Sequence, residues 1–261
     1  MADRVVPGPV ESTAAVREAV CIHTRKIYQT CRDKDCIEDL RVYPTESSQD
    51  VLDGAFGVRA RSAELLFAQP TVNAVSFNRG YYTVDVTYYY RVTGEALTTG
   101  EPIVGLSIFD KRVLLFGSDA SAKVFSSVDD PTVVNTAGLP IAMVETVDPI
   151  ALRMNLVEKK MPEETEQRAI PKSVLEAFEE PLLFSPQCRQ LFVTLGQFSI
   201  IRLERDTQLL IPAYDYCVPE QSCEGSGEED PCTMFSRIQF PLDEFFPPDS
   251  VPEIDTYRNL K

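Results

Sequence analysis

The chain has 261 residues and a formal net charge of −15 at pH 7, with 44% hydrophobic and 25% charged residues. This length allows one large or two modest domains, and the composition argues against a disordered chain. The acidic balance excludes nucleic acid as an expected partner, because phosphate binding requires clustered lysine and arginine.

The first residues, 1 to about 14, form an arm rich in proline, valine and small residues. They contain no apolar stretch of the kind found in signal peptides, so we predict synthesis in the cytoplasm without a signal peptide. No run of residues approaches the roughly 18 apolar positions that a membrane span requires. We therefore expect no membrane span, and the protein would reach a particle or coat only by later release.

Residues 14–28 fit either a helical face or a strand, and their β-branched and aromatic content favours a strand. The segment CRDKDC (31–36) predicts a turn, and residues 37–43 predict a second strand. The clearest element is 81–92, where apolar and polar residues alternate as in a half-buried strand. Gly80 precedes it and supplies the positive φ that a short hairpin needs.

Further strands are predicted along the rest of the chain, at residues 103–109, 112–116, 141–147 and 234–240, with Asp110-Lys111 as the turn between the first two. The charge-dense segment 158–172 carries proline near both ends and predicts a linker. A short helix is expected at 172–180, between Pro171 and Pro181.

A hairpin pattern at 61–90 recurs 126 positions later at 187–216. Arg79 aligns with Arg205, and two tyrosines align with Tyr214 and Tyr216. The fold predicted is mostly β, with duplicated antiparallel β units, sandwich-like, and few short helices. The corresponding domains are an N-terminal β unit at 1–157, the linker at 158–172 and a C-terminal β unit at 173–261. One fused sandwich remains the alternative to two domains.

Seven cysteines leave at least one thiol free or bonded between chains. In a reducing cytoplasm the ordinary state is a free thiol. Their clustering near the two ends of the chain favours disulfide cross-linking after release. The candidates for cross-linking are Cys31, Cys36, Cys217, Cys223 and Cys232.

No motif of a hydrolase, a phosphate-binding loop or a dinucleotide fold occurs, and His23 is the only histidine. The pair Cys31 and Cys36 has four intervening residues, which just fits zinc, but the pair Cys217 and Cys223 has five and does not. The acidic residues near Asp33 lack the glycine and the final glutamate of a calcium loop. We therefore predict no enzyme, no cofactor and no metal site.

Large aromatic side chains offer the best candidates for an interface. Tyr81 and Tyr89 lie on the otherwise polar face of the 81–92 strand, where they either bind a partner or are covered by a second layer. The C-terminal tail combines several prolines with apolar groups that require burial, which suits docking on another subunit. The candidate interface residues are Tyr81, Tyr89, Phe240, Phe245 and Phe246.

Five segments resemble an uncharacterised family of proteins from anaerobic, spore-forming Firmicutes without an assigned activity: 15–45, 76–92 (SFNRGYYTVDVTYYYRV), 105–118 (GLSIFDKRVLLFGS), 189–220 and 237–247 (RIQFPLDEFFP). The resemblance implies a bacterial protein in a sporulation or envelope context. Related proteins often carry a cysteine-rich stretch in the middle, and the corresponding segment here, EKKMPEETEQRAIPK, has no cysteine.

These observations together favour a non-enzymatic structural protein that self-assembles into a coat, lattice or filament, associated with a spore or an envelope. Its expected partners are itself, as a homo-oligomer or polymer, and other coat or envelope proteins. The alternative is a soluble β-sandwich module that binds a polysaccharide or a partner protein through the tyrosine-bearing sheet face.

Overall fold

The structure is a computed structural model that describes residues 18–125, 127, 137–158, 169–185 and 187–213. The chain divides into two compact units, residues 24–207 and residues 1–23 with 208–261. The described residues of the second unit, 18–23 and 208–213, are strand.

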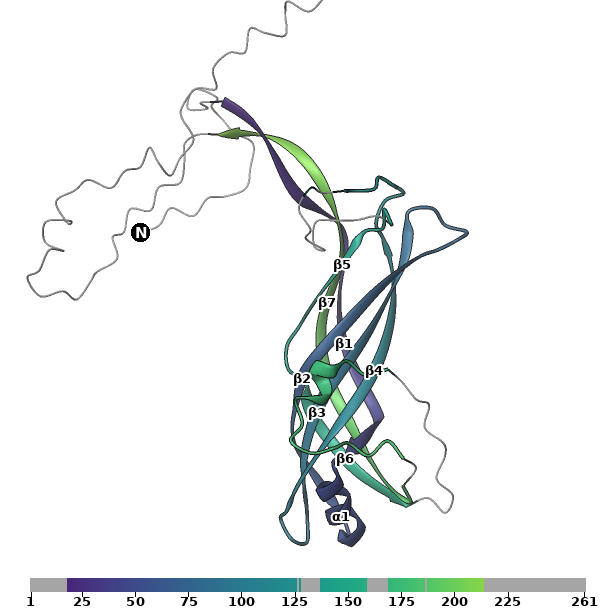
Figure 1. The fold of residues 1–261 in the computed structure, drawn as a ribbon, viewed down its shortest axis with the longest axis vertical. Coiled ribbons are helices and arrows are strands. Elements are labelled where there is room, and N and C mark those ends of the chain that lie inside the picture. Colours follow the sequence, from purple (N-terminus) through teal and green to yellow (C-terminus); the bar gives the residue numbers. More distant parts are fainter. Residues whose placement is uncertain (1–17, 126, 128–136, 159–168, 186, 214–261) are drawn as a thin grey trace, which may run out of the picture. The chain divides into compact units, whose positions relative to one another are not determined.

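The described part of the chain is mostly antiparallel β with two short helices, which confirms the predicted fold class. The strands are hydrogen-bonded in the order β2-β3-β4-β1-β7-β5, and β6 pairs with β7. Between residues 24 and 207 the sheet curves round until it is nearly closed (Figure 1). The elements in chain order are β1 (Glu18–Pro44), α1 (Glu46–Gly54), β2 (Val58–Ala74), β3 (Tyr81–Ala96), β4 (Pro102–Phe116), β5 (Ile141–Thr146), β6 (Ile150–Glu158), α2 (Lys172–Leu175) and β7 (Arg189–Ala213).

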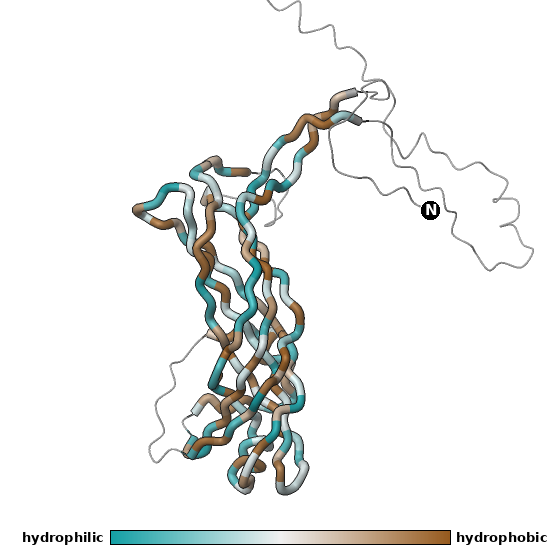
Figure 2. Tube along the Cα trace, turned by 180° about the vertical axis from the view of Figure 1, so that it is seen from behind, coloured by the Kyte–Doolittle hydropathy of each residue, from teal (hydrophilic) through white to brown (hydrophobic). Residues whose placement is uncertain are grey.

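The main core lies inside the curved sheet, where the inner faces of β3 and β7 contribute most of the buried side chains. Every second residue of β3 is buried, as the period of two predicts. The same alternation of apolar and polar residues is visible along several strands in Figure 2. The buried residues of these two strands include Val84, Val86, Tyr88, Tyr90, Val92, Leu191, Val193, Leu195, Ile201 and Leu203.

Contacts of β6 and the residues before it with β2 and β3 hold the curved sheet in its nearly closed form. The backbone N–H of Leu65 in β2 donates to the carboxylate of Asp148, which precedes β6, at 3.0 Å. Met154 of β6 packs directly over Gly94 of β3, where a Cβ atom would stand 2.5 Å from its sulfur. Contacts of this kind cover the edge of β2, which a free sheet would leave open to other chains.

Helix α1 is fixed at both ends by side chains. Thr45 caps its N-terminus by accepting a hydrogen bond from the N–H of Ser48. At the other end the guanidinium of Arg189, the first residue of β7, donates to the carbonyl oxygens of Leu52, Asp53 and Ala55 at 2.8–2.9 Å. The carbonyl oxygen of Leu52 also accepts the N–H of Ala55 at 3.2 Å. The last carbonyls of a helix lack the usual intrahelical donors, and the arginine supplies donors to this end.

Gly105 of β4 is required by the close approach of β1. A Cβ atom at this position would lie 2.6 Å from a methyl group of Val42 and 2.7 Å from the carbonyl oxygen of Tyr43. We expect Gly105→Ala to lower the free energy of unfolding by about 2 kcal/mol, because the two strands must separate to admit the methyl group. Gly54→Ala is the matched control, since no atom lies within 4 Å of its added Cβ. Urea denaturation measures both variants, and equal stabilities would contradict the packing described.

Two predicted turns are wrong, because both segments lie inside continuous strands. CRDKDC (31–36) is part of β1, and Asp110-Lys111 is part of β4, paired with Thr87 and Val86 of β3. The charged residues that suggested turns instead bind one another across the sheet: Lys111 donates to Asp33 and Asp35. Long-range ion pairing therefore overrides the local preference of these residues for turns.

The second predicted hairpin, at 187–216, is also wrong over the residues that the structure describes. Residues 189–213 form the single strand β7. The residues near Arg205, where the turn is expected, lie within this strand, and Glu204 pairs with Ile141 of β5. The first hairpin does turn, with Gly80 at φ +81°, whereas Asp206 stands at the aligned position. Without a glycine there, the chain continues as a strand.

The predicted linker, 158–172, has its residues 159–168 outside the described part. Strands from its two sides, β6 and β7, pair with each other from Ile150↔Gly196 to Glu158↔Arg189. The segment therefore joins neighbouring strands of one sheet, and the division into domains at this point stays a prediction. The short helix expected after it begins at Lys172, as predicted, and ends at Leu175.

Candidate functional site

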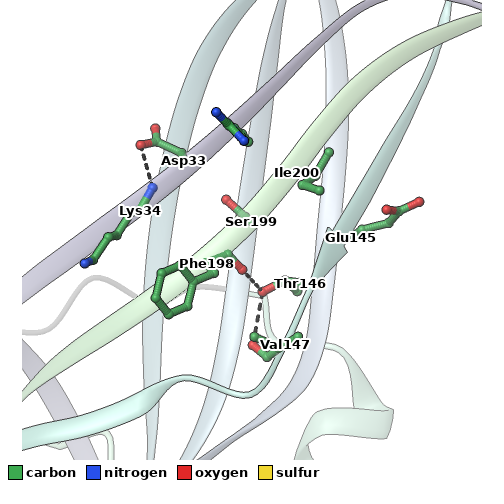
Figure 3. Close-up of a pocket in the computed structure, with 9 residues that line it drawn as sticks. Asp33, Lys34, Glu145, Thr146, Val147, Phe198, Ser199 and Ile200 are labelled. Carbon is green, nitrogen blue, oxygen red and sulfur yellow. Dashed lines mark hydrogen bonds between the residues drawn. The ribbon is translucent and has the colours of Figure 1, made fainter.

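A groove of about 560 Å³ runs across the outer face of β1, β7 and β5. Figure 3 shows residues from all three strands around it: Lys34 from β1, Phe198 and Ile200 from β7, and Glu145 from β5. The antiparallel pairing of Ile200 with Glu145 brings β5 and β7 together at this point. At the last residue of β5, the hydroxyl of Thr146 donates to the carbonyl oxygen of Phe198 at 2.8 Å and shapes the groove wall.

The groove has three parallel rows of different chemistry. The row from β1 is basic, with Arg32 and Lys34, and the Lys34 ammonium lies 5.7 Å from the centre of the Phe198 ring. The row from β7 is apolar, with Phe198 45% exposed and Ile200 39% exposed. The row from β5 carries Glu145. The arrangement suits a ligand or a protein surface with apolar groups at its centre and charges at its sides.

The acidic side of the groove contains a charge cluster with a net charge of −1. Arg202 of β7 donates to both Glu145 and Glu204, and its distance to Glu204 is 2.5 Å. These two hydrogen bonds raise the pKa of the Arg202 guanidinium. One arginine faces two carboxylates, so the cluster keeps an unbalanced negative charge, and Glu145 is the more exposed of the two acids.

Behind the groove, Lys111 lies inside the sheet between two carboxylates. Its ammonium donates to Asp33 at 2.8 Å and to Asp35 at 2.5 Å, and its side chain is 8% exposed. Burial alone would lower the pKa of Lys111, but the two carboxylates outweigh burial and raise it. The hydrogen bond from Lys111 lowers the pKa of Asp33. Lys111 and Asp33 thus stay charged at neutral pH, and the hydrogen bonds of Lys111 join β1 to β4.

Several polar groups lie in the same interior. Tyr90 donates to the side-chain oxygen of Gln197, and burial raises the pKa of both Tyr88 and Tyr90. Among the described residues, the buried amide nitrogen of Gln197 has no hydrogen-bond partner. Groups of three or more histidine, cysteine or acidic residues that could hold a metal ion are absent from the described ranges.

The structure separates the two tyrosines that the sequence proposed for an interface. Tyr89 is 4% exposed and packs with Leu106, Val174 and Phe178, so the second layer considered in the sequence analysis covers it. Tyr81 is half-buried, and its ring lies 5.3 Å from that of Phe116. For Tyr89 the structure thus shows the covered state, one of the two alternatives left open, and an interface role for either tyrosine stays a prediction.

The four described cysteines are free thiols, at positions 21, 31, 36 and 188. Cys31 and Cys36 were candidates for cross-linking; Cys36 is exposed, whereas Cys31 points inward and is half-buried. The other three candidates, Cys217, Cys223 and Cys232, lie outside the described residues, as do Phe240, Phe245 and Phe246.

The two described candidates should differ in reactivity. Burial raises the pKa of Cys31, so less of its thiol is ionised near neutral pH. We expect iodoacetamide to modify Cys31 at least about tenfold more slowly than Cys36. Trypsin cuts at Arg32 and Lys34 between them, so mass spectrometry after a short pulse resolves the two sites. The same measurement in urea gives the reference rates of the unfolded chain, where the two cysteines should react equally fast. Equal rates in the folded protein would contradict the burial of Cys31.

Sequence reasoning missed the groove itself. The sequence pattern predicts residues 198–202 as part of a hairpin, which assigns no outer face to Phe198 and Ile200. A usable signal was present, because β7 carries large apolar residues at both odd and even positions near Phe198, Ile200 and Ile201. A strand with apolar side chains on both faces is covered on both sides or exposes one apolar face.

The described part of the chain is thus a nearly closed antiparallel sheet with a groove on its outer face. Over 64 residues the chain is 38% identical to Exosporium protein A from Clostridium sporogenes (strain ATCC 15579). The match covers 24% of this chain and spans 20% of the length of that protein. No family model matches the chain, and no solved structure matches it.

Clostridium sporogenes is a spore-forming Firmicute, so the predicted resemblance to proteins of such bacteria is confirmed. No helix among the described ranges has the length and the apolar character needed to cross a membrane.

Proposed function

We propose that this protein is a non-enzymatic structural protein of a bacterial spore surface, and that it associates with copies of itself into a coat or lattice. The observation that carries the proposal is the 64-residue match to a protein named for the exosporium. Other proteins of the coat or envelope are the further partners that this location offers.

The described chemistry supports a structural role. Two charged groups with a shifted pKa, the buried Lys111 and the half-buried Arg202, are held by carboxylates of the same chain. Such ion pairs shift pKa values without any catalytic role. The exposed apolar residues of the groove, by contrast, suit contact between proteins.

The alternative function, a binding module for a polysaccharide or a partner protein, rested on the face that carries Tyr81 and Tyr89. Tyr89 is covered by α2 and the residues that follow it, and Tyr81 packs against Phe116. This face therefore offers little exposed aromatic surface for stacking on a sugar ring. The structural role is the better supported of the two.

Disulfide cross-links between chains belong to the same proposal. Among the described cysteines, Cys36 is exposed on β1 and accessible to another chain. The cysteines at 217, 223 and 232 offer further thiols in the sequence.

Immunogold labelling of thin-sectioned spores from the source organism tests the location. We expect gold particles on the outermost layers of mature spores and none on spores of a strain that lacks the gene. Label confined to the mother-cell cytoplasm or to the spore core would contradict the proposal.

A further inference from the structure

Several exposed apolar side chains of the 24–207 unit gather around the groove. Val147, Ile150, Leu152, Phe198 and Ile200 are 39–62% exposed. Ile150 pairs opposite Gly196, and Leu152 lies 3.5 Å from where a Cβ of Gly196 would stand, so both share the outer face with Phe198 and Ile200. We call these five residues the apolar patch. A patch of this kind marks a surface that another molecule covers.

The order of the strands places opposite charges on the two sides of this patch. β7 lies between β1 and β5 in the sheet. The β1 side carries Arg32 and Lys34, and neither cation is engaged by Asp33, whose carboxylate binds Lys111. The β5 side carries Glu145 and the cluster with a net charge of −1. The surface is thus basic, apolar and acidic in sequence across the strands.

Such a surface is complementary to itself. Two copies can face each other across a two-fold axis that runs along β7. This axis places the β1 side of one copy against the β5 side of the other, at the same height along β7. Apolar β7 then covers apolar β7, and the basic β1 row meets the acidic β5 row twice. An axis across the strands would instead place β1 against β1 and oppose like charges, which is costly.

We infer that the occupant of the groove is a second copy of this chain, bound face to face through the apolar patch, with Arg32 of each copy opposite Glu145 of the other. The inference rests on the proposed function and names the contact by which the chain associates. Shape and apolar burial supply the affinity, and the paired charges set the orientation.

A charge-reversal mixture tests the orientation. Arg32→Glu alone and Glu145→Lys alone each place like charges at both contacts of a dimer, so each variant should dimerise at least about tenfold more weakly than the wild type. In an equimolar mixture, a heterodimer of the two variants joins opposite charges at both contacts. Sedimentation equilibrium should therefore find the dimer restored in the mixture. Arg79→Glu is the control, because Arg79 lies in the turn before β3, away from the patch.

Phe198→Ser tests the apolar centre and should also weaken the dimer at least about tenfold, whereas Phe77→Ser, in an exposed turn, should not. Thermal unfolding of each variant shows that the fold is kept. Two results would overturn this contact and leave the proposed function standing, provided that the wild type assembles. In one, the variants assemble as well as the wild type; in the other, the mixture fails to restore association. A wild type that stays monomeric at every concentration would overturn both.

Discussion

Replacing Arg205 by methionine should lower the free energy of unfolding by about 4 kcal/mol, because the loss leaves several buried acceptors without a donor. Arg205 is 9% exposed, and its guanidinium donates to the carbonyl oxygens of Gly117 and Gly138 at 2.6 and 2.8 Å and to the hydroxyl of Tyr82 at 2.8 Å. It also lies 5.7 Å from the centre of the Tyr82 ring. One side chain thereby joins β7 to β3 and to the segments after β4 and before β5.

Arg79→Met is the matched control for this variant. Arg79 aligns with Arg205 in the sequence repeat, but it is exposed in the turn between β2 and β3. Its replacement should change the free energy of unfolding by less than about 0.5 kcal/mol. Urea denaturation followed by circular dichroism measures both. Equal effects of the two substitutions would show that Arg205 does not hold these segments together.

Lys111→Met should be the second most damaging change, with a loss of about 3 kcal/mol at neutral pH, because it leaves two carboxylates facing each other without a cation. This loss lies at the lower end of the range expected for breaking a buried ion pair, because the Asp33 side chain is half exposed. Lys123→Met, at an exposed position, is the control and should be nearly neutral. Indistinguishable denaturation midpoints for the two variants would contradict the account of Lys111.

The loss at Lys111 should also depend on pH in a defined direction. Lys111 lowers the pKa of Asp33 in the folded protein, so this contribution to stability is present above the pKa of an unfolded aspartate, about 3.9. It disappears as the pH falls through the lower pKa of the folded state. The Lys111→Met variant lacks this contribution. At low pH, protonation also removes the repulsion between the two carboxylates of the variant. The two stability curves should therefore converge below about pH 4.

The strands were predictable where local pattern and tertiary packing agree. In β3 the alternation from Tyr82 to Val92 reports a buried inner face, and Gly80 marks the preceding turn, because both signals depend on neighbours in sequence. In 31–36 the charged residues resemble a turn, and only Lys111, far away in the chain, explains why they form a strand. Pairings of this kind leave no local trace.

The repeat and the groove show the same limit. Arg79 and Arg205 align, yet one lies exposed in a turn and the other is buried among carbonyl oxygens, because the strand pairing of β7 with β5 decides the second environment. The groove needs β1, β7 and β5 side by side, and residues from these three strands are far apart in sequence. A single chain's pattern gives the faces of strands, but not their order in the sheet.

The central claim is that this chain builds a structure by association with copies of itself, and light scattering followed by negative-stain imaging tests it most directly. The purified 261-residue chain is measured across a range of concentrations, with and without reductant. The account predicts a mass that rises with concentration and regular assemblies in the images, and their loss under reductant would assign a part of the contacts to the cysteines. A particle that keeps the 29.2 kDa mass of one chain at every concentration, oxidised and reduced, would contradict it.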